Sequence, residues 1–473
     1  MTGMFKLLSS MRLTVFLFAL SIVIIFTGTL AQIDKGIWTV VDSYFRSACV
    51  YIEFNIFFPR TMKVPGGFYF PGGWLIGFAL MVNLFCAHVV RFKATARGWR
   101  LLCGALLLAL ALLVLMLVIL GTFGHDINTT HQDAFWRVLW RLGKGGGVAL
   151  LLLAACLLLF GKRAGIVLIH CGVFLLLVSE LVTGLFAVES TMLIKEGEVV
   201  NFIDHSNTLE LAFTNTSEPD HDIVTVVPST MLKTGALIRH EQLPCDIKVL
   251  RYLRNSSFPE KMKFVKDSDN PATAGAGLEY AVRESGEESG VSLNQQKDTP
   301  SAYVTLLEKN SGRNLGTYLV SLWFYGNHTQ RELDLPQKLL LNGRTYTMML
   351  RYEREILFSK GSAQPFSLHL LDFKHETYIG TNKPSNFSSL VRLRDPGQKI
   401  DREVNIWMNN PMRYADLTFY QSSFLPDDSG TVLQVVRNSG WMIPYLACMI
   451  VTTGLLVHML AKLLKFLRKS RLS

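Results

Sequence analysis

The chain has 473 residues, of which 49% are hydrophobic and 18% are charged, and its formal net charge is +10. This length would allow about three soluble domains, but the apolar residues are gathered in blocks long enough to cross a bilayer. The basic residues lie mostly beside these blocks, which is typical of membrane proteins and gives no indication of nucleic acid binding.

Six apolar blocks predict a polytopic α-helical membrane protein with about six spans, because a helix needs roughly 20 apolar residues to cross a bilayer. The first block could also be a signal peptide, but no clear cleavage site follows it. The turn between the fourth and fifth blocks, "GKRAG", predicts a tight hairpin. The spans are expected at about 11–31, 73–92, 101–123, 147–161, 165–187 and 441–461.

Lysine and arginine are concentrated in four segments that fall on the same side of the membrane if there are six spans: the N-terminus, 91–100, 161–165 and the C-terminal tail. Cytoplasmic loops are enriched in these residues. We therefore expect both termini in the cytoplasm and the long polar stretch between the last two spans outside. The basic segment "DAFWRVLWRLGKG" opposes this pattern, and its amphipathic character predicts an interfacial helix.

Residues 190–437 change to a period of two, as in "SAYVTLLEKN" and "REVNIWMNNP". This alternation predicts half-buried strands, and many short strands with frequent turns predict an all-β sandwich or barrel. The pair Asn342-Gly343 predicts a β-hairpin. The Gly-, Ser- and acid-rich stretch 267–300 predicts a mobile insertion. The expected organisation is thus a five-helix bundle at 1–189, a β-rich extracytoplasmic domain at 190–437, and a last helix with a basic tail at 438–473.

Three histidines, His88, His170 and His458, fall within the predicted spans. Each lies near basic residues that mark the cytoplasmic end of its span, so they are expected at similar depth although they belong to helices of opposite direction. An ionisable residue in a span indicates a functional site, and neutral imidazole ligates haem iron or other transition metals. The alternative is that each histidine is a packing residue. For Glu180, also within a span, a structural role paired inside the bundle is expected.

Seven cysteines occur, without a CxxC or CxxCH motif. This excludes a thioredoxin-like oxidoreductase or a c-type cytochrome by motif. Only Cys49 and Cys245 are expected outside the membrane, either paired with each other or as two isolated thiols.

Four stretches resemble the ResB (CcsB) family of system II cytochrome c biogenesis proteins. The first is "SSMRLTVFLFALSIVIIFTGTLAQ", the second "YFPGGWLIGFALMVNLFCAHVVRF", and the third "GIVLIHCGVFLLLVSELVTGLFAVESTMLIKEGE". The most specific is "NNPMRYADLTFYQSSFLPDDSGTVLQVVRNSGWMIPYLACMIVTTGLLVHML", in which a β segment leads into the last span. The usual family member has four spans, so the pair at about 101–161 is additional.

The resemblance implies a subunit of the membrane cytochrome c synthase, which moves haem b, its transient substrate, outward and supports attachment to the CxxCH thiols of an apocytochrome c. It implies a ResC (CcsA) partner and a bacterial inner (plasma) membrane location with the β domain in the periplasm. It does not decide whether the subunit is co-catalytic or non-catalytic. His88 matches a histidine that is an axial ligand of haem iron at the inner site, followed in rank by His458 and His170. The resemblance matches Cys245 to the family's functional outer cysteine, and Cys49 is the second candidate redox thiol.

Two other functions remain open. The chain could be a scaffold for ResC without haem of its own, with all three histidines as packing residues. It could also be a b-type haem electron-transfer subunit, although such a subunit normally needs histidine pairs at two depths. Substitution of His88 distinguishes the scaffold from the haem-site protein.

Overall fold

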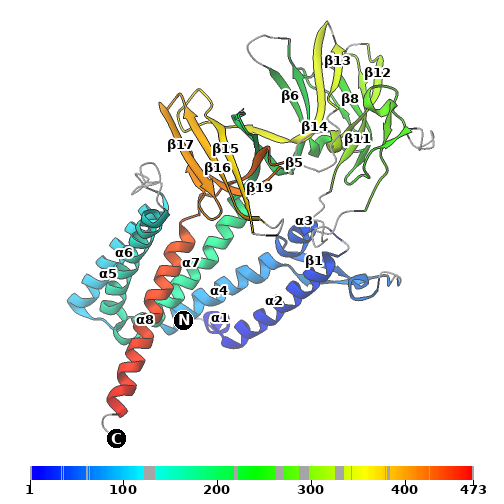
Figure 1. Ribbon diagram of the computed structural model, residues 1–473. Coiled ribbons are helices and arrows are strands. Elements are labelled where there is room, and N and C mark those ends of the chain that lie inside the picture. The colour runs from blue at the N-terminus through cyan, green and yellow to red at the C-terminus, as the bar shows by residue number, and fades with distance from the viewer. Residues whose placement is uncertain are drawn as a thin grey trace.

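The computed structural model describes the chain except for residues 1–2, 34, 36, 60–61, 63, 122–133, 218–221, 263–269, 287–297, 310, 325–334, 342, 379, 381–383, 426 and 471–473. Within it, five helical segments are long and apolar enough to cross a membrane, four before a large β domain and one after it (Figure 1). The predicted class, a helical membrane protein with a β domain before its last span, is confirmed at this level. The five segments are Met11–Ala31, Gly73–Arg91, Gly98–Ile119, Val138–Phe186 and Ile443–Arg468.

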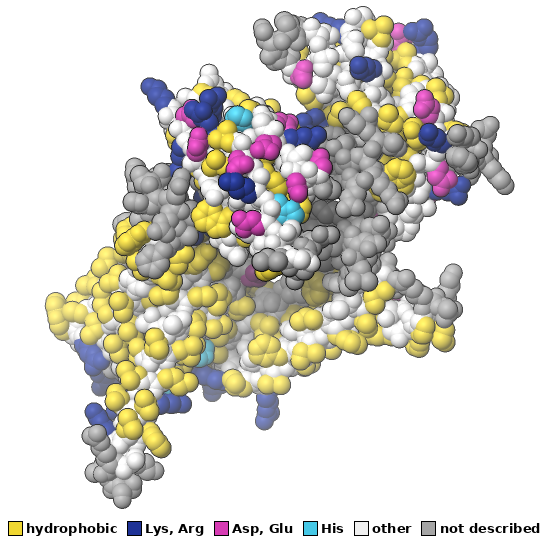
Figure 2. Space-filling view, in the orientation of Figure 1, with side chains coloured by type: hydrophobic (Ala, Val, Ile, Leu, Met, Phe, Trp, Pro, Cys, Tyr) yellow, Lys and Arg dark blue, Asp and Glu magenta, His cyan; other side chains and the backbone are white. Residues whose placement is uncertain are grey.

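Hydrophobic side chains cover the helical part, whereas charged side chains gather on the β domain and at the lower ends of the helices (Figure 2). This distribution is the one that a lipid environment requires, because exposed apolar residues at such density would not be stable in water. The helices are α1 Gly3–Leu8, α2 Met11–Ala31, α3 Ile37–Val40, α4 Gly73–Arg91, α5 Gly98–Ile119, α6 Ala134–Phe160, α7 Ala164–Phe186 and α8 Ile443–Ser470.

The fourth segment, 49 residues long, contains two helices joined by the 3-10 turn Gly161–Arg163. Gly161 has φ +56, a value that glycine adopts without strain. The expected boundary between an interfacial helix and the fourth span is absent, because Ala134–Phe160 form one continuous helix. The apolar face of this helix packs on α5, α7 and α8 from Val148 onward. In the basic stretch, the Arg141 guanidinium lies over the Trp441 ring, 5.2 Å from its centroid.

The β domain consists of two sandwiches that share one sheet, which confirms the expected sandwich architecture. An eight-stranded sheet has the order β13-β14-β5-β3-β20-β19-β18, with β6 also paired to β5. The strands are β1 Cys49–Glu53, β2 Gly67–Pro71, β3 Val188–Lys195, β4 Val199–Val200, β5 Phe202–Asn215, β6 Ile223–Pro228, β7 Leu237–Ile238, β8 Asp246–Leu253, β9 Glu260–Lys261, β10 Tyr280–Ala281, β11 Ser301–Leu307, β12 Asn314–Ser321, β13 Gln337–Leu341, β14 Arg344–Ile356, β15 Ser367–Thr377, β16 Pro384–Asp395, β17 Ile400–Trp407, β18 Met412–Tyr414, β19 Leu417–Phe424 and β20 Gly430–Arg437.

Each half of the shared sheet is covered by a four-stranded sheet. The sheet β17-β16-β15-β4 closes one core, which includes Ile194, Phe366 and Phe419. The sheet β12-β11-β8-β7 closes the other, which includes Phe213 and Val304. The long strands β5 and β14, of 14 and 13 residues, pair along both halves. They therefore make the two sandwiches one continuous unit.

Two predictions about loops have different outcomes. The hairpin is present, because β13 pairs with β14 with Leu341 opposite Arg344, although Asn342 itself is outside the described residues. The expected mobile insertion differs: residues 270–286 contain a 3-10 turn and β10, which pairs with β9. Ala272 and Ala276 of this segment pack against a buried cluster around Tyr303 and Leu319, and this burial orders a stretch whose composition alone suggests mobility. The remaining 267–269 and 287–297 lie outside the described residues.

Helices α7 and α8 pack closely through small residues. A Cβ added to Gly165 would lie 2.9 Å from the carbonyl oxygen of Gly454, and one added to Gly172 would lie 2.5 Å from Cγ2 of Val451. The contacts pair the start of α7 with the later part of α8, so the two helices are antiparallel. Glycines at such spacing let two membrane helices approach until their backbones touch.

A buried carboxylate organises the first sandwich. Asp395 is fully buried and accepts a 2.6 Å hydrogen bond from the Tyr414 hydroxyl and a 3.0 Å bond from the Gln398 amide. Burial alone would raise the pKa of Asp395, but these hydrogen bonds to the charged form outweigh it and hold the pKa below its usual value. Nearby, Gln421 accepts from Ser389 and donates to Thr431, which ties β16, β19 and β20 together.

We expect Tyr414→Phe to lower the free energy of unfolding by about 2 kcal/mol at neutral pH, because a hydrogen bond to a buried charge is lost. A carboxylate whose pKa is lower in the folded state than in the unfolded state stabilises the fold at pH values above its unfolded pKa of about 4. This stabilisation is lost as the pH falls through its folded pKa. The difference in free energy of unfolding between wild type and Tyr414→Phe should therefore be constant above about pH 4 and become smaller below it. Denaturant unfolding of the detergent-solubilised chain, followed by tryptophan fluorescence, measures this; a difference that grows in acid would contradict it.

Candidate functional site

Helices α4 and α7 meet through aromatic and histidine side chains. The rings of His88 and His170 have centroids 6.4 Å apart, and the rings of Phe85 and Phe174 lie 6.2 Å apart. The earlier residue of α4 pairs with the later residue of α7, so the helices run antiparallel, as the predicted topology requires. The structure thus brings together two of the three predicted histidines, from segments about 80 residues apart.

Phe92 completes a triangle of rings, 5.1 Å from His88 and 5.3 Å from His170. Nδ1 of His170 lies 2.8 Å from the carbonyl oxygen of Ile166. If Nδ1 donates this bond, the tautomer is fixed and Nε2 keeps its lone pair, the arrangement that metal-ligating histidines usually have. For the His88 ring, no hydrogen bond is found within the described part of the chain. Both imidazoles are half-buried, so they can accept a ligand from the side.

The triangle also limits what can bind in the structure as it stands. Phe92 packs against both imidazoles, and a porphyrin plane shared by the two rings would extend into the space that it fills. A shared porphyrin therefore requires Phe92 to move. Ligation by His88 alone, from its exposed side, needs no such change.

His458 does not join the pair. It lies against Gly165, since a Cβ on that glycine would be 3.0 Å from the His458 amide nitrogen and 3.1 Å from its Cβ. Gly165 precedes His170 by five residues, about 7.5 Å along α7. The expectation of similar depth is thus met by His88 and His170, whereas His458 lies nearer the basic turn 161–163. Its contact with α7 is what a packing residue makes.

The α4 segment is held in place by a polar contact with the N-terminal segment. Asn83, which is buried, donates to the carbonyl oxygens of Leu8 (2.6 Å) and Ser10 (3.2 Å) and accepts from the Thr14 hydroxyl (2.7 Å). Asn83 lies five residues before His88, so this contact fixes the helix that carries the histidine. It was not predicted, although the rule used for the histidines, that a polar residue in a span has a purpose, applies to it equally.

We expect Asn83→Leu to destabilise the α2–α4 contact by about 2 kcal/mol, because two carbonyl groups and one hydroxyl lose their partner in an apolar setting. Asn83→Asp is a second variant that removes only the donated hydrogen bonds. Its side chain still accepts from the Thr14 hydroxyl but cannot donate to the carbonyl oxygens of Leu8 and Ser10. Thermal unfolding in detergent should rank wild type above both variants. A stability of Asn83→Leu equal to that of wild type would show that water or lipid headgroups replace these bonds.

The two candidate redox thiols are not paired; both are free. Cys245 is fully buried in the second sandwich core, and burial raises the pKa of its thiol to about 12. A protonated, inaccessible thiol is a poor nucleophile, so Cys245 has the properties of a structural residue. Cys49 is exposed on β1. A redox role for either residue remains a prediction.

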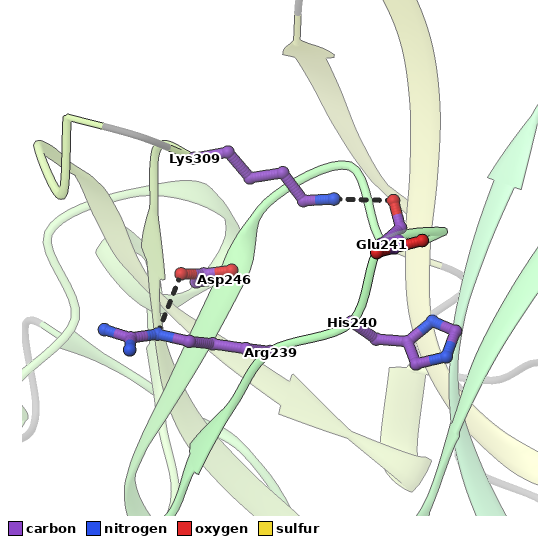
Figure 3. Close-up of a pocket in the computed structure, with 5 residues that line it drawn as sticks. All are labelled: Arg239, His240, Glu241, Asp246 and Lys309. Carbon is purple, nitrogen blue, oxygen red and sulfur yellow. Dashed lines mark hydrogen bonds and ion pairs between the residues drawn. The ribbon is translucent and has the colours of Figure 1, made fainter.

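A surface hollow of about 310 Å³ lies on the β domain (Figure 3). It is lined by Arg239, His240, Glu241, Asp246 and Lys309. Three of its charged side chains have local partners: Arg239 pairs with Asp246 at 3.1 Å, and Lys309 donates to the backbone carbonyl of Glu241 at 2.6 Å. The His240 ring points away from this ion pair (Figure 3). Within the described part of the chain no group of three or more potential metal ligands exists, here or elsewhere. The hollow therefore offers no metal site.

An ion-pair network lies where the β domain joins the helices. Glu355 of β14 binds Arg437, the last residue of β20, at 2.5 Å and His205 of β5 at 3.2 Å. Burial opposes its charge, but Arg437 and His205 outweigh this effect and lower the pKa of Glu355. The next residue, Asn438, donates to the hydroxyl of Thr183 on α7 at 3.3 Å. The network therefore connects the shared sheet to the ends of α7 and α8.

The comparisons with known proteins identify one part of the chain. The sequence profile of a family described as ResB-like matches residues 336–435, which contain β13–β19 and most of β20. Protein NrfI of Wolinella succinogenes is 38% identical over 96 residues, which are 20% of this chain and 11% of that protein. The match thus spans about a tenth of the length of this curated relative. The resemblance stated from the sequence is confirmed by both findings.

Proposed function

We propose, from the premise that this chain is ResB-like at residues 336–435, that it is the ResB-type subunit of a membrane cytochrome c synthase. In this proposal the chain carries haem b across the membrane and, with a ResC-type subunit, supports its attachment to the CxxCH thiols of an apocytochrome c. The observation that carries the proposal is the position of His88 beside His170 in the α4–α7 contact, with the ring centroids 6.4 Å apart.

The proposed topology has six spans. The 49-residue segment Val138–Phe186 is far longer than one crossing needs, and the turn Gly161–Arg163 divides it into α6 and α7. Six crossings put the basic ends of α4 and α8 and this turn on the cytoplasmic side. The β domain then lies in the periplasm, where apocytochrome c is matured, and the His88–His170 pair lies toward the cytoplasmic face.

In the proposed mechanism His88 provides one axial ligand to the iron of the haem that enters from the cytoplasmic side. The second ligand comes from the ResC-type subunit, because the closed ring triangle of His88, Phe92 and His170 leaves no room for a porphyrin between the two histidines of this chain. The protein contributes proximity and orientation, whereas haem and the substrate thiols supply the reactive groups. A catalytic triad is therefore not needed in this subunit.

The test is maturation of a reporter cytochrome c in cells that lack the chain. We expect the wild-type chain, expressed with its ResC-type partner, to restore covalently bound haem in the exported reporter, measured by haem staining after denaturing electrophoresis. Exported reporter polypeptide without haem should accumulate when the chain is absent. Normal haem attachment in its absence would refute the proposal.

A second function, a scaffold for the ResC-type subunit without haem of its own, is favoured by one observation. Phe92 packs against both imidazoles as a core residue would. A scaffold would retain full maturation activity when His88 is replaced, provided that the ResC-type subunit is still present at its normal level.

A further inference from the structure

The α4–α7 contact is confined to one end of the two helices. On α7, Leu177 and Leu181 follow Phe174 at positions i+3 and i+7, so they continue the same helix face, yet both are exposed. On α4, Phe85, Phe78 and Trp74 continue outward from His88 on the face toward α7, and all three are exposed. The facing surfaces have thus separated within about one turn of the Phe85–Phe174 contact. Figure 1 shows α4 and α7 diverging from their lower ends toward the β domain.

A carboxylate without a partner in the described residues lies at the edge of this exposed surface, turned about 80° around α7 from His170. Glu180 continues the line of Val173 and Leu177 on α7 at i, i+4 and i+7. It is 16 residues, about 24 Å, from the start of the helix, and six residues of helix follow it. The side chain is exposed, and it makes no hydrogen bond or ion pair within the described residues. The expected pairing inside the bundle is therefore absent in the structure.

A carboxylate at this depth normally faces a bundle interior and pairs with a cation or a hydrogen-bond donor. Lipid tails offer neither. The facing surfaces of α4 and α7 are otherwise apolar and aromatic. Such surfaces can pack against a membrane helix of about 10 Å diameter, whereas a water-filled channel would need polar side chains along them. The chemistry thus requires an apolar helix that carries one basic or donor side chain opposite Glu180.

We propose that the diverging faces of α4 and α7 hold a transmembrane helix of the ResC-type subunit, with a lysine, arginine or other donor side chain bound to Glu180. This inference rests on the proposed function for the identity of the partner, but the surface is defined by the chain itself. The docked helix lies directly above His88, so it also closes the outer side of the histidine pair against lipid.

The experiment is site-directed photo-crosslinking in membranes of cells that express the full chain and the ResC-type subunit. p-Benzoylphenylalanine replaces Leu177 or, as a control, Leu106, an exposed residue of α5 on the added helical pair. Both positions are exposed, so neither label disturbs the core. Irradiation should give a cross-link from position 177 to a membrane-spanning peptide of the ResC-type subunit that carries a basic or donor residue, and none from position 106.

Glu180→Leu in the position-177 background should lower the cross-link yield at least tenfold. Glu189→Leu, at an exposed acid on β3, is the matched control and should leave the yield unchanged. A lipid adduct only, or a cross-link to a second copy of this chain, would overturn the inference. Cross-linking to the ResC-type subunit from position 106 but not 177 would overturn it and leave the proposed function intact. Absence of any cross-link to that subunit from either position would count against both.

Discussion

We expect His88→Ala to reduce the b-type haem that co-purifies with the chain and its ResC-type partner at least tenfold. The imidazole is a direct iron ligand in the proposed mechanism, and no hydrogen bond of its ring is found within the described residues, so the substitution removes a ligand without leaving a buried polar group unpaired. The measurement is the reduced absorption spectrum of the purified complex, normalised to protein. His240→Ala, at the surface of the β domain, is the matched control.

Two companion measurements separate ligation from packing. Free imidazole added during purification should restore the haem band in His88→Ala, because it can occupy the space left by the side chain and ligate the iron. His170→Ala should lower the haem content less, about two- to fivefold, since His170 contacts His88 and Phe92 but is not the assigned ligand. If His170→Ala loses haem and His88→Ala keeps it, the assignment is reversed; if both keep it, the scaffold is the better description.

The second large effect is expected in the α7–α8 contact. Gly172→Leu should destabilise the helical part by about 3 kcal/mol, the upper end of the usual overpacking cost. Its Cβ alone would lie 3.0 Å from the Val451 amide nitrogen and 3.1 Å from the Ala447 carbonyl oxygen. Backbone atoms cannot move aside as a side chain can, so the two helices must separate.

Gly184→Leu is the control on the same helix, because a Cβ there meets nothing within 4 Å. Both substitutions raise intrinsic helix propensity equally, so the difference between them reports packing alone. The fraction of monodisperse protein after heating in detergent, measured by size-exclusion chromatography, should fall for Gly172→Leu and stay at the wild-type level for Gly184→Leu. Equal behaviour of the two variants would show that α7 and α8 do not depend on this close approach.

The sequence predicts the helices of this protein well because length and hydropathy alone decide whether a segment can cross a membrane. The spans predicted at 73–92 and 165–187 coincide with the helices Gly73–Arg91 and Ala164–Phe186. The helix Ala134–Phe160 was not anticipated in full, since its basic first part is stabilised by neighbours that the local sequence does not reveal. The position of each histidine along its helix likewise predicts that His88 and His170 can meet. It does not predict that His458 faces Gly165, because position along a helix does not determine the direction in which a side chain points around the helix axis.

The stretch that carries the most specific resemblance contains residues with a structural role in the β domain. In "NNPMRYADLTFYQSS" the Tyr414 hydroxyl binds the buried Asp395, and the Gln421 amide links β16 to β20. These residues help to build the first sandwich core, and they lie far along the chain from the histidines. The motif that carries the resemblance therefore does not locate the candidate site. Strand pairing across the whole domain, such as β5 with β14, depends on long-range contacts that alternation does not specify.

The shared sheet has a mechanical consequence. Strands β5 and β14 are paired from Tyr346 to Ile356, with one register shift, through both sandwich cores. The register shift lies at the boundary between the cores: Tyr352 pairs with Leu209 and Arg354 pairs with Asp204. The strands therefore run through both sandwiches, but their hydrogen-bonded pairing is interrupted between the two cores. The lower end of the domain is fastened through Glu355 and Arg437 to the strand that leads into α8. A movement of the near sandwich is thus passed directly to α8, whereas the interrupted pairing between the cores leaves the far sandwich less tightly coupled to it.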